Sequence, residues 1–191
     1  MGKKLLALLG SPHKDGATGT MIKYVLQIAE QQGWQIEFVN LYEQRIGYCN
    51  GCRICIKTGN CVQKDDAQEI SRLIRECDMV VLAAPVYWAN IPAVVKNIFD
   101  RLLGVALEET RTFPKARLSK NQKYFLLTAC NTPAPFSYLC GQSTGAIRSM
   151  KEFFEKSGMK YAGKCVWAGL DKQAMPKYIK KKITRILKRY V

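Results

Sequence analysis

The sequence lacks any long hydrophobic run. None of its apolar stretches approaches the roughly eighteen residues that a membrane-spanning helix needs. The apolar start "MGKKLLALLG" is interrupted by "SPHKDG" before it reaches the length of a signal peptide, and no small-residue cleavage site follows it. We therefore expect no membrane segment and a cytoplasmic protein, whose eight cysteines are thiols rather than disulfides.

Acidic residues are also scarce, with 15 Asp and Glu against 30 Lys and Arg and a net charge of +15. Residues 151–191 hold twelve of the basic residues and only three acidic ones. No zinc finger or RNA-recognition motif accompanies this charge, so no specific nucleic-acid partner is expected. The end of the chain, "KYIKKKITRILKRYV", predicts an amphipathic helix whose basic face is either solvated or a docking surface for an anion or acidic partner.

Two common nucleotide-binding motifs are missing from "GSPHKDGATGT", residues 10–20, which is neither a G-x-G-x-x-G fingerprint nor a Walker loop. It is a Ser, Thr and Gly loop that opens a helix. Backbone N–H groups at that helix start, with the hydroxyls of Ser11, Thr18 and Thr20 and the charge of His13 or Lys14, suit a phosphate monoester. An ordinary turn in which Thr18 or Thr20 caps its own helix is the alternative, and both interpretations stay open.

Apolar strands and amphipathic helices alternate along the chain. Strands are expected at 3–10, 34–41, 78–88, 123–130 and 163–169, and helices at 18–33, 65–77, 91–104, 144–158 and 177–191. This rhythm predicts one α/β domain over residues 1–191, a flavodoxin-like three-layer αβα sandwich with a five-stranded parallel sheet of order 2-1-3-4-5. Ligands of such sheets bind beyond the carboxyl ends of the strands, so the loops after the first, third and fourth strands are the expected site.

The loop after the third strand carries two aromatic residues in "APVYWAN", residues 84–90. Tyr87 and Trp88 follow a buried strand directly and precede a helix, which suits stacking against a flat ligand. Packing of the next helix onto the sheet is the alternative role for these side chains.

The segment "CNGCRICIKTGNC" holds half of the eight cysteines with the spacing C-x2-C-x2-C-x5-C, at Cys49, Cys52, Cys55 and Cys61. Four thiolates in one loop are compatible with a [4Fe-4S] cluster, while free thiols and a structural zinc remain alternatives. A thioredoxin-like pair is disfavoured because neither C-x-x-C is expected to open a helix. The other four cysteines are scattered along the chain, and most of them are expected to be buried apolar residues; they are Cys77, Cys130, Cys140 and Cys165.

Taken in order, the phosphate-loop candidate, the cysteine segment and "APVYWANIPAVVKNIFDRL" resemble the NADPH-dependent FMN reductase and iron-sulfur flavoprotein family, over about the first 103 residues. The resemblance implies that the FMN phosphate is bound by Ser11, His13, Gly16, Ala17 and Thr18. It implies that the ribityl chain and ring are surrounded by Pro85, Val86, Tyr87, Trp88 and Asn90, and approached by Ala129, Cys130 and Asn131. The cysteine pattern is that of the iron-sulfur flavoproteins, although similar segments occur in members thought to carry flavin alone.

The chain departs from the family pattern at two places. His13 stands where the family usually has arginine, so a titratable charge replaces a fixed one and phosphate affinity is expected to fall above neutral pH. The loop after the fourth strand reads "TACNTPAPFSYLCGQSTG" instead of a Gly-rich turn, which points to a substrate or dimer surface there.

We therefore expect an FMN-dependent oxidoreductase that passes electrons from NAD(P)H to a quinone, a nitro compound, a metal ion or a protein acceptor. Because the flavin performs the chemistry, no catalytic residue is assigned. One alternative is an iron-sulfur flavoprotein that exchanges electrons between FMN, a [4Fe-4S] cluster and ferredoxin. Another class is a flavin-binding or regulatory protein without turnover. A homodimer or higher homo-oligomer is a family-level expectation.

Overall fold

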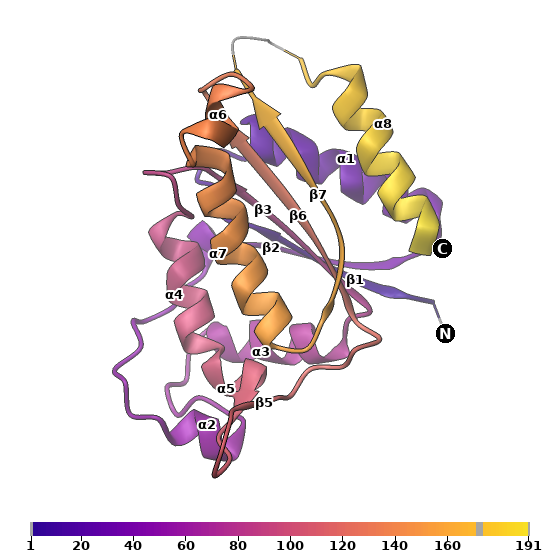
Figure 1. The fold of residues 1–191 in the computed structure, drawn as a ribbon. Coiled ribbons are helices and arrows are strands. Elements are labelled where there is room, and N and C mark those ends of the chain that lie inside the picture. Colours follow the sequence, from indigo (N-terminus) through magenta and orange to yellow (C-terminus); the bar gives the residue numbers. More distant parts are fainter. Residues whose placement is uncertain (1, 171–173, 191) are drawn as a thin grey trace.

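The computed structural model describes residues 2–170 and 174–190. At its centre are five parallel strands in the order β2-β1-β3-β6-β7 (Figure 1). The strands are β1 (Lys4–Leu9), β2 (Gln35–Asn40), β3 (Met79–Pro85), β6 (Lys123–Cys130) and β7 (Lys160–Ala168). Since β6 and β7 are the fourth and fifth strands of the sequence analysis, the predicted sheet order is confirmed.

Helices cover both faces of the sheet. One face packs against α1 (Ala17–Gln31) and α8 (Lys177–Leu187), and the other against α3 (Ala67–Glu76), α4 (Ala93–Arg101) and α7 (Gln142–Lys156). Alternate residues of each central strand enter opposite cores, as a pleated strand requires. In β3, for example, Val81 belongs to the α1 and α8 core, whereas Leu82 belongs to the other.

Five short elements were not expected from the sequence, because segments of two to five residues carry no readable periodicity. They are η1 (Leu41–Glu43), α2 (Ile54–Thr58), β4 (Leu107–Glu108), β5 (Lys115–Ala116) and α6 (Phe136–Leu139). Two further short helices, α5 (Leu103–Ala106) and η2 (Lys188–Tyr190), follow the ends of longer helices within or across the expected ranges. The helix expected over 91–104 is therefore two helices, α4 and α5. The helix expected over 177–191 ends at Leu187, and residue 191 lies outside the described residues.

Proline and glycine set several element boundaries. Pro92 and Pro176 precede the first residues of α4 and α8. Gly33 follows α1 with a φ of 74°, a left-handed conformation that glycine adopts without strain. No helix in the described ranges is long and apolar enough to cross a membrane.

Candidate functional site

The loops after β1, β3 and β6 lie side by side at one edge of the sheet. The strand register pairs Leu9 with Ala83, and Pro85 with Ala129. Two hydrogen bonds continue this register into the loops, from Gly10 N–H to the Ala83 carbonyl oxygen at 2.8 Å and from Val86 N–H to the Ala129 carbonyl oxygen at 3.0 Å. The structure thus brings together the three segments that hold the predicted flavin residues.

The first loop ends at Gly16, which precedes α1 in an extended conformation and makes no side-chain cap hydrogen bond. The interpretation in which Thr18 or Thr20 caps the helix is therefore wrong. Within the described part of the chain, no acceptor is bonded to the N–H groups of Ala17, Thr18 and Gly19. Free N–H groups at the positive end of a fifteen-residue helix fit a phosphate group.

The same loop folds closely over the first turn of α1. A Cβ on Gly19 would lie 2.0 Å from the Lys14 carbonyl oxygen, so only glycine fits there. The Ser11 hydroxyl is buried and accepts a hydrogen bond from His13 N–H at 3.2 Å. The side chain of His13 is itself exposed. The loop is therefore shaped by backbone contacts and leaves the His13 imidazole accessible to a bound anion.

Residues 87–90 form a tight two-residue turn rather than the end of β3, so the strand expected as far as residue 88 stops at Pro85. Tyr87 and Asn90 exchange backbone hydrogen bonds of 2.8 and 2.9 Å. Trp88 and Ala89 between them have φ values of 51° and 57°, a conformation usually taken by Asn-Gly. Strained backbone of this kind persists where the surroundings fix it and is frequent at functional sites.

The turn is fixed from two sides. The Ala89 carbonyl oxygen would lie 2.0 Å from a Cβ on Gly145, so the turn rests directly on the backbone of α7. The Asn90 side-chain oxygen accepts hydrogen bonds from Ile91 N–H at 2.8 Å and from the Ser149 hydroxyl at 2.6 Å. Trp88 is 100% exposed, so it does not pack the following helix onto the sheet, and its indole is free for a flat ligand or a partner.

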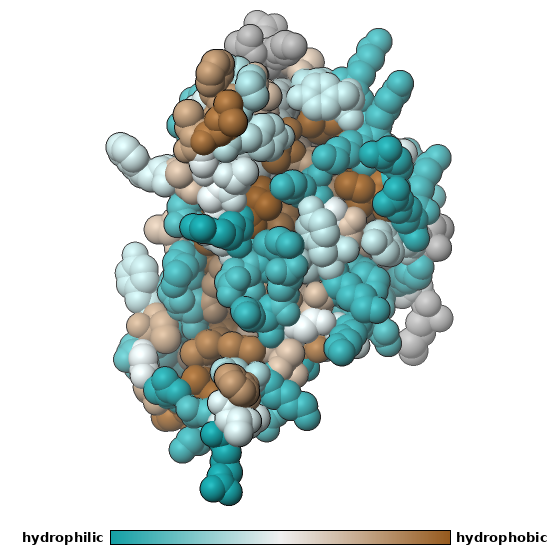
Figure 2. All heavy atoms as spheres, viewed as in Figure 1, coloured by the Kyte–Doolittle hydropathy of each residue, from teal (hydrophilic) through white to brown (hydrophobic). Residues whose placement is uncertain are grey.

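The third loop, which follows β6, contributes mainly backbone groups to the candidate flavin site. Ala129 and Cys130 are buried, whereas Asn131 is exposed. Burial raises the pKa of the Cys130 thiol, with a smaller opposing effect from Ser137. Beyond them, hydrophobic side chains gather on the surface over α6, as Figure 2 shows, and include the exposed Phe136 and Leu139.

An apolar groove of about 830 Å³ begins at the Tyr87–Asn90 turn and runs between α4 and α7. Its floor includes Phe99 and Phe153, whose rings stack with centroids 4.2 Å apart. Trp88 lines its upper end. The groove therefore connects the predicted flavin edge to a hydrophobic surface of the α4 and α7 layer.

The cysteine segment lies at the opposite end of α4 from the flavin loops (Figure 1). Asn90 is close to the first residue of this nine-residue helix and Arg101 is its last, a separation of about 13 Å along the helix axis. Arg101 has a fully buried side chain that bonds Asp65 at 2.5 and 2.9 Å and the Gly47 carbonyl oxygen at 2.7 Å. One guanidinium thus ties together the two ends of the segment.

Further contacts hold the middle of this segment. Arg117 donates to the Ile56 carbonyl oxygen at 2.9 Å, and Arg75 donates to that of Gly59. A Cβ on Gly104 would lie 2.3 Å from the Cys55 carbonyl oxygen, so α5 packs directly against α2. Arginines from three parts of the chain therefore hold the cysteine segment through its backbone.

The four thiols lie in one neighbourhood but differ in exposure. Cys49 and Cys52 are exposed, Cys55 is buried and Cys61 is intermediate. Burial raises the pKa of the Cys55 thiol; a hydrogen bond from Gly104 N–H lowers it, and the other three thiols raise it further. In residues 2–170 and 174–190, no three His, Cys, Asp or Glu side chains are grouped so that they could hold a metal ion. The thiols are thus near one another without forming a ligand set in this conformation.

One expectation about these cysteines was wrong. The helix α2 begins at Ile54, directly after Cys52 and Arg53, so one C-x-x-C pair does adjoin a helix start. The raised pKa of Cys55 still separates this pair from a thioredoxin-like one, in which the thiol pKa is lowered. Elsewhere, Cys77, Cys130 and Cys165 are buried and Cys140 is exposed, which confirms the expectation that most of these four are buried.

The fold and the three-loop edge define a flavodoxin-like protein, and comparisons with known proteins specify the family. The family model for NADPH-dependent FMN reductase matches residues 3–167. The chain belongs to this NADPH-dependent FMN reductase family.

Several relatives are named iron-sulfur flavoproteins. One from Archaeoglobus fulgidus is 42% identical over 100 residues, which cover 52% of this chain and 46% of the relative. One from Methanocaldococcus jannaschii is 32% identical over 98 residues, which cover 51% of each chain. The chain thus spans about half the length of the curated relatives it matches.

Solved structures share the fold at low identity. An FMN-dependent NADH-azoreductase of Bacillus anthracis, solved in complex with FMN, matches with a TM-score of 0.75 at 17% identity over 98% of both chains. An NAD(P)H:quinone oxidoreductase of Methanothermobacter marburgensis matches with a TM-score of 0.74 at 17% identity, over 99% of this chain and 94% of that one. At such identities the likeness establishes the flavodoxin-like architecture.

Proposed function

We propose that this protein binds FMN at the carboxyl edge of its sheet and acts as an NAD(P)H-dependent oxidoreductase. The observation that carries the proposal is the set of free N–H groups at Ala17, Thr18 and Gly19, beside a turn that presents Trp88 at the same edge. The family assignment supports the same function. When bound, FMN supplies hydride acceptance and electron transfer, and the protein supplies binding and orientation.

Each loop has a separate task in this proposal. The start of α1, with Ser11, His13, Gly16, Ala17 and Thr18, holds the phosphate through N–H donors and the helix dipole. Backbone of Pro85 and Val86 and the side chains of Tyr87, Trp88 and Asn90 orient the ribityl chain and the ring. Ala129, Cys130 and Asn131 close the edge from β6, where burial of Cys130 keeps water from the ring. No side chain is required to transfer a proton.

A comparison of FMN with riboflavin tests this arrangement. The phosphate loop predicts that FMN binds at least about a hundredfold more tightly than riboflavin, which has no phosphate group, because charge-assisted hydrogen bonds contribute about 1.5–3 kcal/mol each. Quenching of flavin fluorescence measures both affinities. Equal affinities would refute the assignment of the α1 start, and no binding of either flavin would refute the proposed function.

We also propose a homodimer, formed through the apolar groove between α4 and α7. A second copy placed there would cover Phe99, Phe153 and the exposed Trp88, and would enclose the flavin edge. Sedimentation or light scattering of the wild type and of Phe153→Glu tests it: the wild type is expected as a dimer and the variant as a monomer. A monomeric wild type would refute it. The eight free thiols support placing the protein in a reducing compartment such as the cytoplasm.

An iron-sulfur flavoprotein is the second candidate, favoured by the closeness of the four cysteine thiols and by the names of the relatives. The side chains as arranged are not a ligand set, so a [4Fe-4S] cluster requires the exposed stretch with Cys49 and Cys52 to move toward Cys55 and Cys61. The position of this segment at the far end of α4 favours exchange with the flavin of a second subunit. The basic face of α8 is then the proposed docking surface for ferredoxin.

Iron and acid-labile sulfide analysis of protein purified without oxygen separates the two candidates. About four iron and four sulfide per chain would establish the cluster version, and their absence would leave the flavin-only enzyme. A flavin-loaded protein that neither NADH nor NADPH reduces, and that reduced ferredoxin also fails to reduce, would support a binding or regulatory role without turnover.

A further inference from the structure

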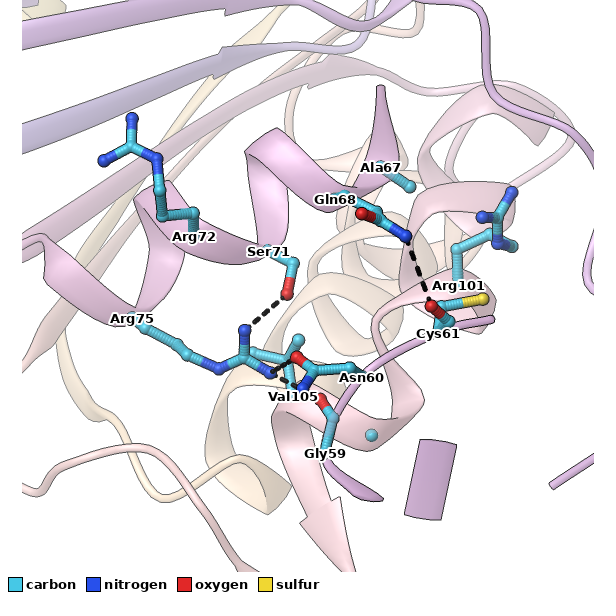
Figure 3. Close-up of a pocket in the computed structure, with 11 residues that line it drawn as sticks. Gly59, Asn60, Cys61, Ala67, Gln68, Ser71, Arg72, Arg75, Arg101 and Val105 are labelled. Carbon is cyan, nitrogen blue, oxygen red and sulfur yellow. Dashed lines mark hydrogen bonds between the residues drawn. The ribbon is translucent and has the colours of Figure 1, made fainter. Parts of the chain in front are cut away.

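A second, smaller pocket lies between α3 and the cysteine segment, away from the flavin edge. It encloses about 220 Å³ and is shown in Figure 3. Its walls come from α3, from the end of α4 and from the stretch around Cys61. The polar side chains that line it include Asn60, Cys61, Gln68, Ser71, Arg75 and Arg101.

The lining of this pocket is strongly basic. Arginine supplies its three charged side chains, and no aspartate or glutamate lines it. The positive charges of two of these arginines are balanced by carboxylates outside the pocket lining. Arg72 forms ion pairs with Glu69 and Glu76, and Arg101 forms one with Asp65. The pocket nevertheless carries an uncompensated positive charge, as the third arginine shows.

Arg75 is the source of this charge. Among the described residues, it has no carboxylate within the 4 Å of an ion pair. It donates hydrogen bonds to the Ser71 hydroxyl at 2.7 Å and to the Asn60 side-chain oxygen at 3.2 Å, so its guanidinium is held at the pocket wall (Figure 3). Burial and the nearby Arg117 both lower the pKa of Arg75. An anion bound in the pocket would offset the electrostatic repulsion between Arg75 and Arg117.

Arg101, by contrast, is already neutralised. Its terminal nitrogens bond Asp65 and the carbonyl oxygens of Gly47 and Gln63, and its side chain is fully buried, so it offers no donor to a ligand. Arg75 is therefore the arginine of the lining whose charge is left for an anion. Figure 3 shows Cys61 directly beside Arg101, at the end of the pocket opposite Arg75.

We propose that this pocket binds a small tetrahedral oxyanion of the phosphate or sulfate type, held by Arg75 in the same pocket that Cys61 lines. Arginine suits such an ion because its planar donors match the oxygen atoms in pairs. The volume accommodates the ion together with a few water molecules, for which Gln68 and Ser71 offer further polar contacts. This site shares no residue with the proposed flavin phosphate loop, so both can be occupied at once.

Titration with inorganic phosphate, followed by calorimetry on the FMN-saturated protein, tests the proposal. Saturable binding at one site per chain is expected in the FMN-saturated protein, where the flavin phosphate occupies the α1 start. Phosphate binding that occurs only without FMN belongs to the α1 start, and the absence of saturable binding to the FMN-saturated protein would overturn the proposal. Sulfate should compete with phosphate at this site.

Two variants locate the site. Arg75→Gln should weaken phosphate binding at least tenfold, whereas Arg148→Gln on the exposed side of α7 should leave it unchanged. Because Arg75 also holds the cysteine segment, Ser71→Asp provides an independent test: it places a carboxylate in the pocket beside an intact Arg75 and should abolish binding. Phosphate affinity unchanged in Ser71→Asp would overturn the proposal.

Alkylation of individual cysteines gives a further readout. In the wild type without bound metal, phosphate should slow the modification of Cys61 by iodoacetamide and leave that of Cys49 and Cys52 unchanged. Equal effects on all three thiols would show that phosphate acts elsewhere and would contradict the proposed position.

Discussion

Gly145 in α7 lies directly against the carbonyl oxygen of Ala89, with no room between them for a side chain. This contact supports the turn that presents Trp88 at the flavin edge. The Gly145→Ala substitution should therefore displace the turn, weaken FMN binding and destabilise the protein by about 1–3 kcal/mol through overpacking. Helix propensity alone predicts the opposite sign, a gain of about 1 kcal/mol.

Urea unfolding and flavin fluorescence measure the two effects of this substitution. Thr144→Ala, at the exposed neighbouring position of α7, is the matched control and should change stability by no more than about 0.5 kcal/mol. A Gly145→Ala variant that is as stable as the wild type and binds FMN equally well would show that the turn does not depend on this contact.

The exposed His13 at the phosphate loop gives a prediction about flavin affinity. Arginine carries a fixed charge and matches phosphate oxygens through paired donors. His13→Arg should therefore lower the FMN dissociation constant about three- to tenfold and leave the binding of riboflavin, which has no phosphate, unchanged. An unchanged FMN dissociation constant would place His13 outside the phosphate site.

The buried pair of Asp65 and Arg101 should govern acid stability. Burial acts to raise the pKa of Asp65, but hydrogen bonds from Arg101, Gly47 N–H and Ala67 N–H outweigh it and lower the pKa below 3.8. A lowered pKa contributes stability above about pH 4 that is lost as the pH falls through the folded-state value. Asp65→Asn should cost about 3–5 kcal/mol at pH 7, because it leaves a buried guanidinium without its carboxylate.

Urea unfolding at pH 7 and again toward pH 2 checks this prediction. The difference between the wild type and Asp65→Asn should shrink as the wild-type carboxylate becomes protonated. Asp100→Asn removes an exposed pair with Lys96 on the same helix and should change stability by less than about 1 kcal/mol. A pH-independent difference between the wild type and Asp65→Asn would contradict the assigned charge state.

The cysteines should differ in reactivity. Burial raises the pKa of Cys77 and Cys165 to about 12, so both should resist iodoacetamide at pH 8 in the folded protein. The exposed Cys140 should react, as should Cys49 and Cys52 in protein without bound metal. Mass spectrometry of pulse-labelled protein measures each site. Protection of Cys49 and Cys52 that a chelator removes would reveal a bound metal or cluster, and rapid labelling of Cys165 would contradict the described core.

Sequence patterns predicted the sheet because each strand and each long helix carries its own periodicity. The order of the five strands and the meeting of the three loops followed from general rules for parallel sheets. The turn at Trp88 and Ala89 could not be foreseen, since neither residue favours a positive φ and the contact with Gly145 that stabilises it comes from a distant helix.

The surroundings of the cysteine segment were also beyond sequence reasoning. The spacing of Cys49, Cys52, Cys55 and Cys61 indicated that the four thiols share a loop. It did not indicate which arginines hold the backbone of that loop in place. Arg101 bonds residues 36 and 54 positions away in the chain, and no local pattern encodes such pairs. The basic pocket beside Cys61 likewise arises only when α3 and α4 come together.

The most direct test of the flavin assignment is an absorption spectrum of protein purified without oxygen and loaded with FMN, recorded before and after addition of NADPH. The account predicts the two visible bands of bound oxidised flavin, which bleach when NADPH is added. A protein that remains colourless after incubation with FMN, and that passes no electrons from NADPH to a quinone, would contradict it.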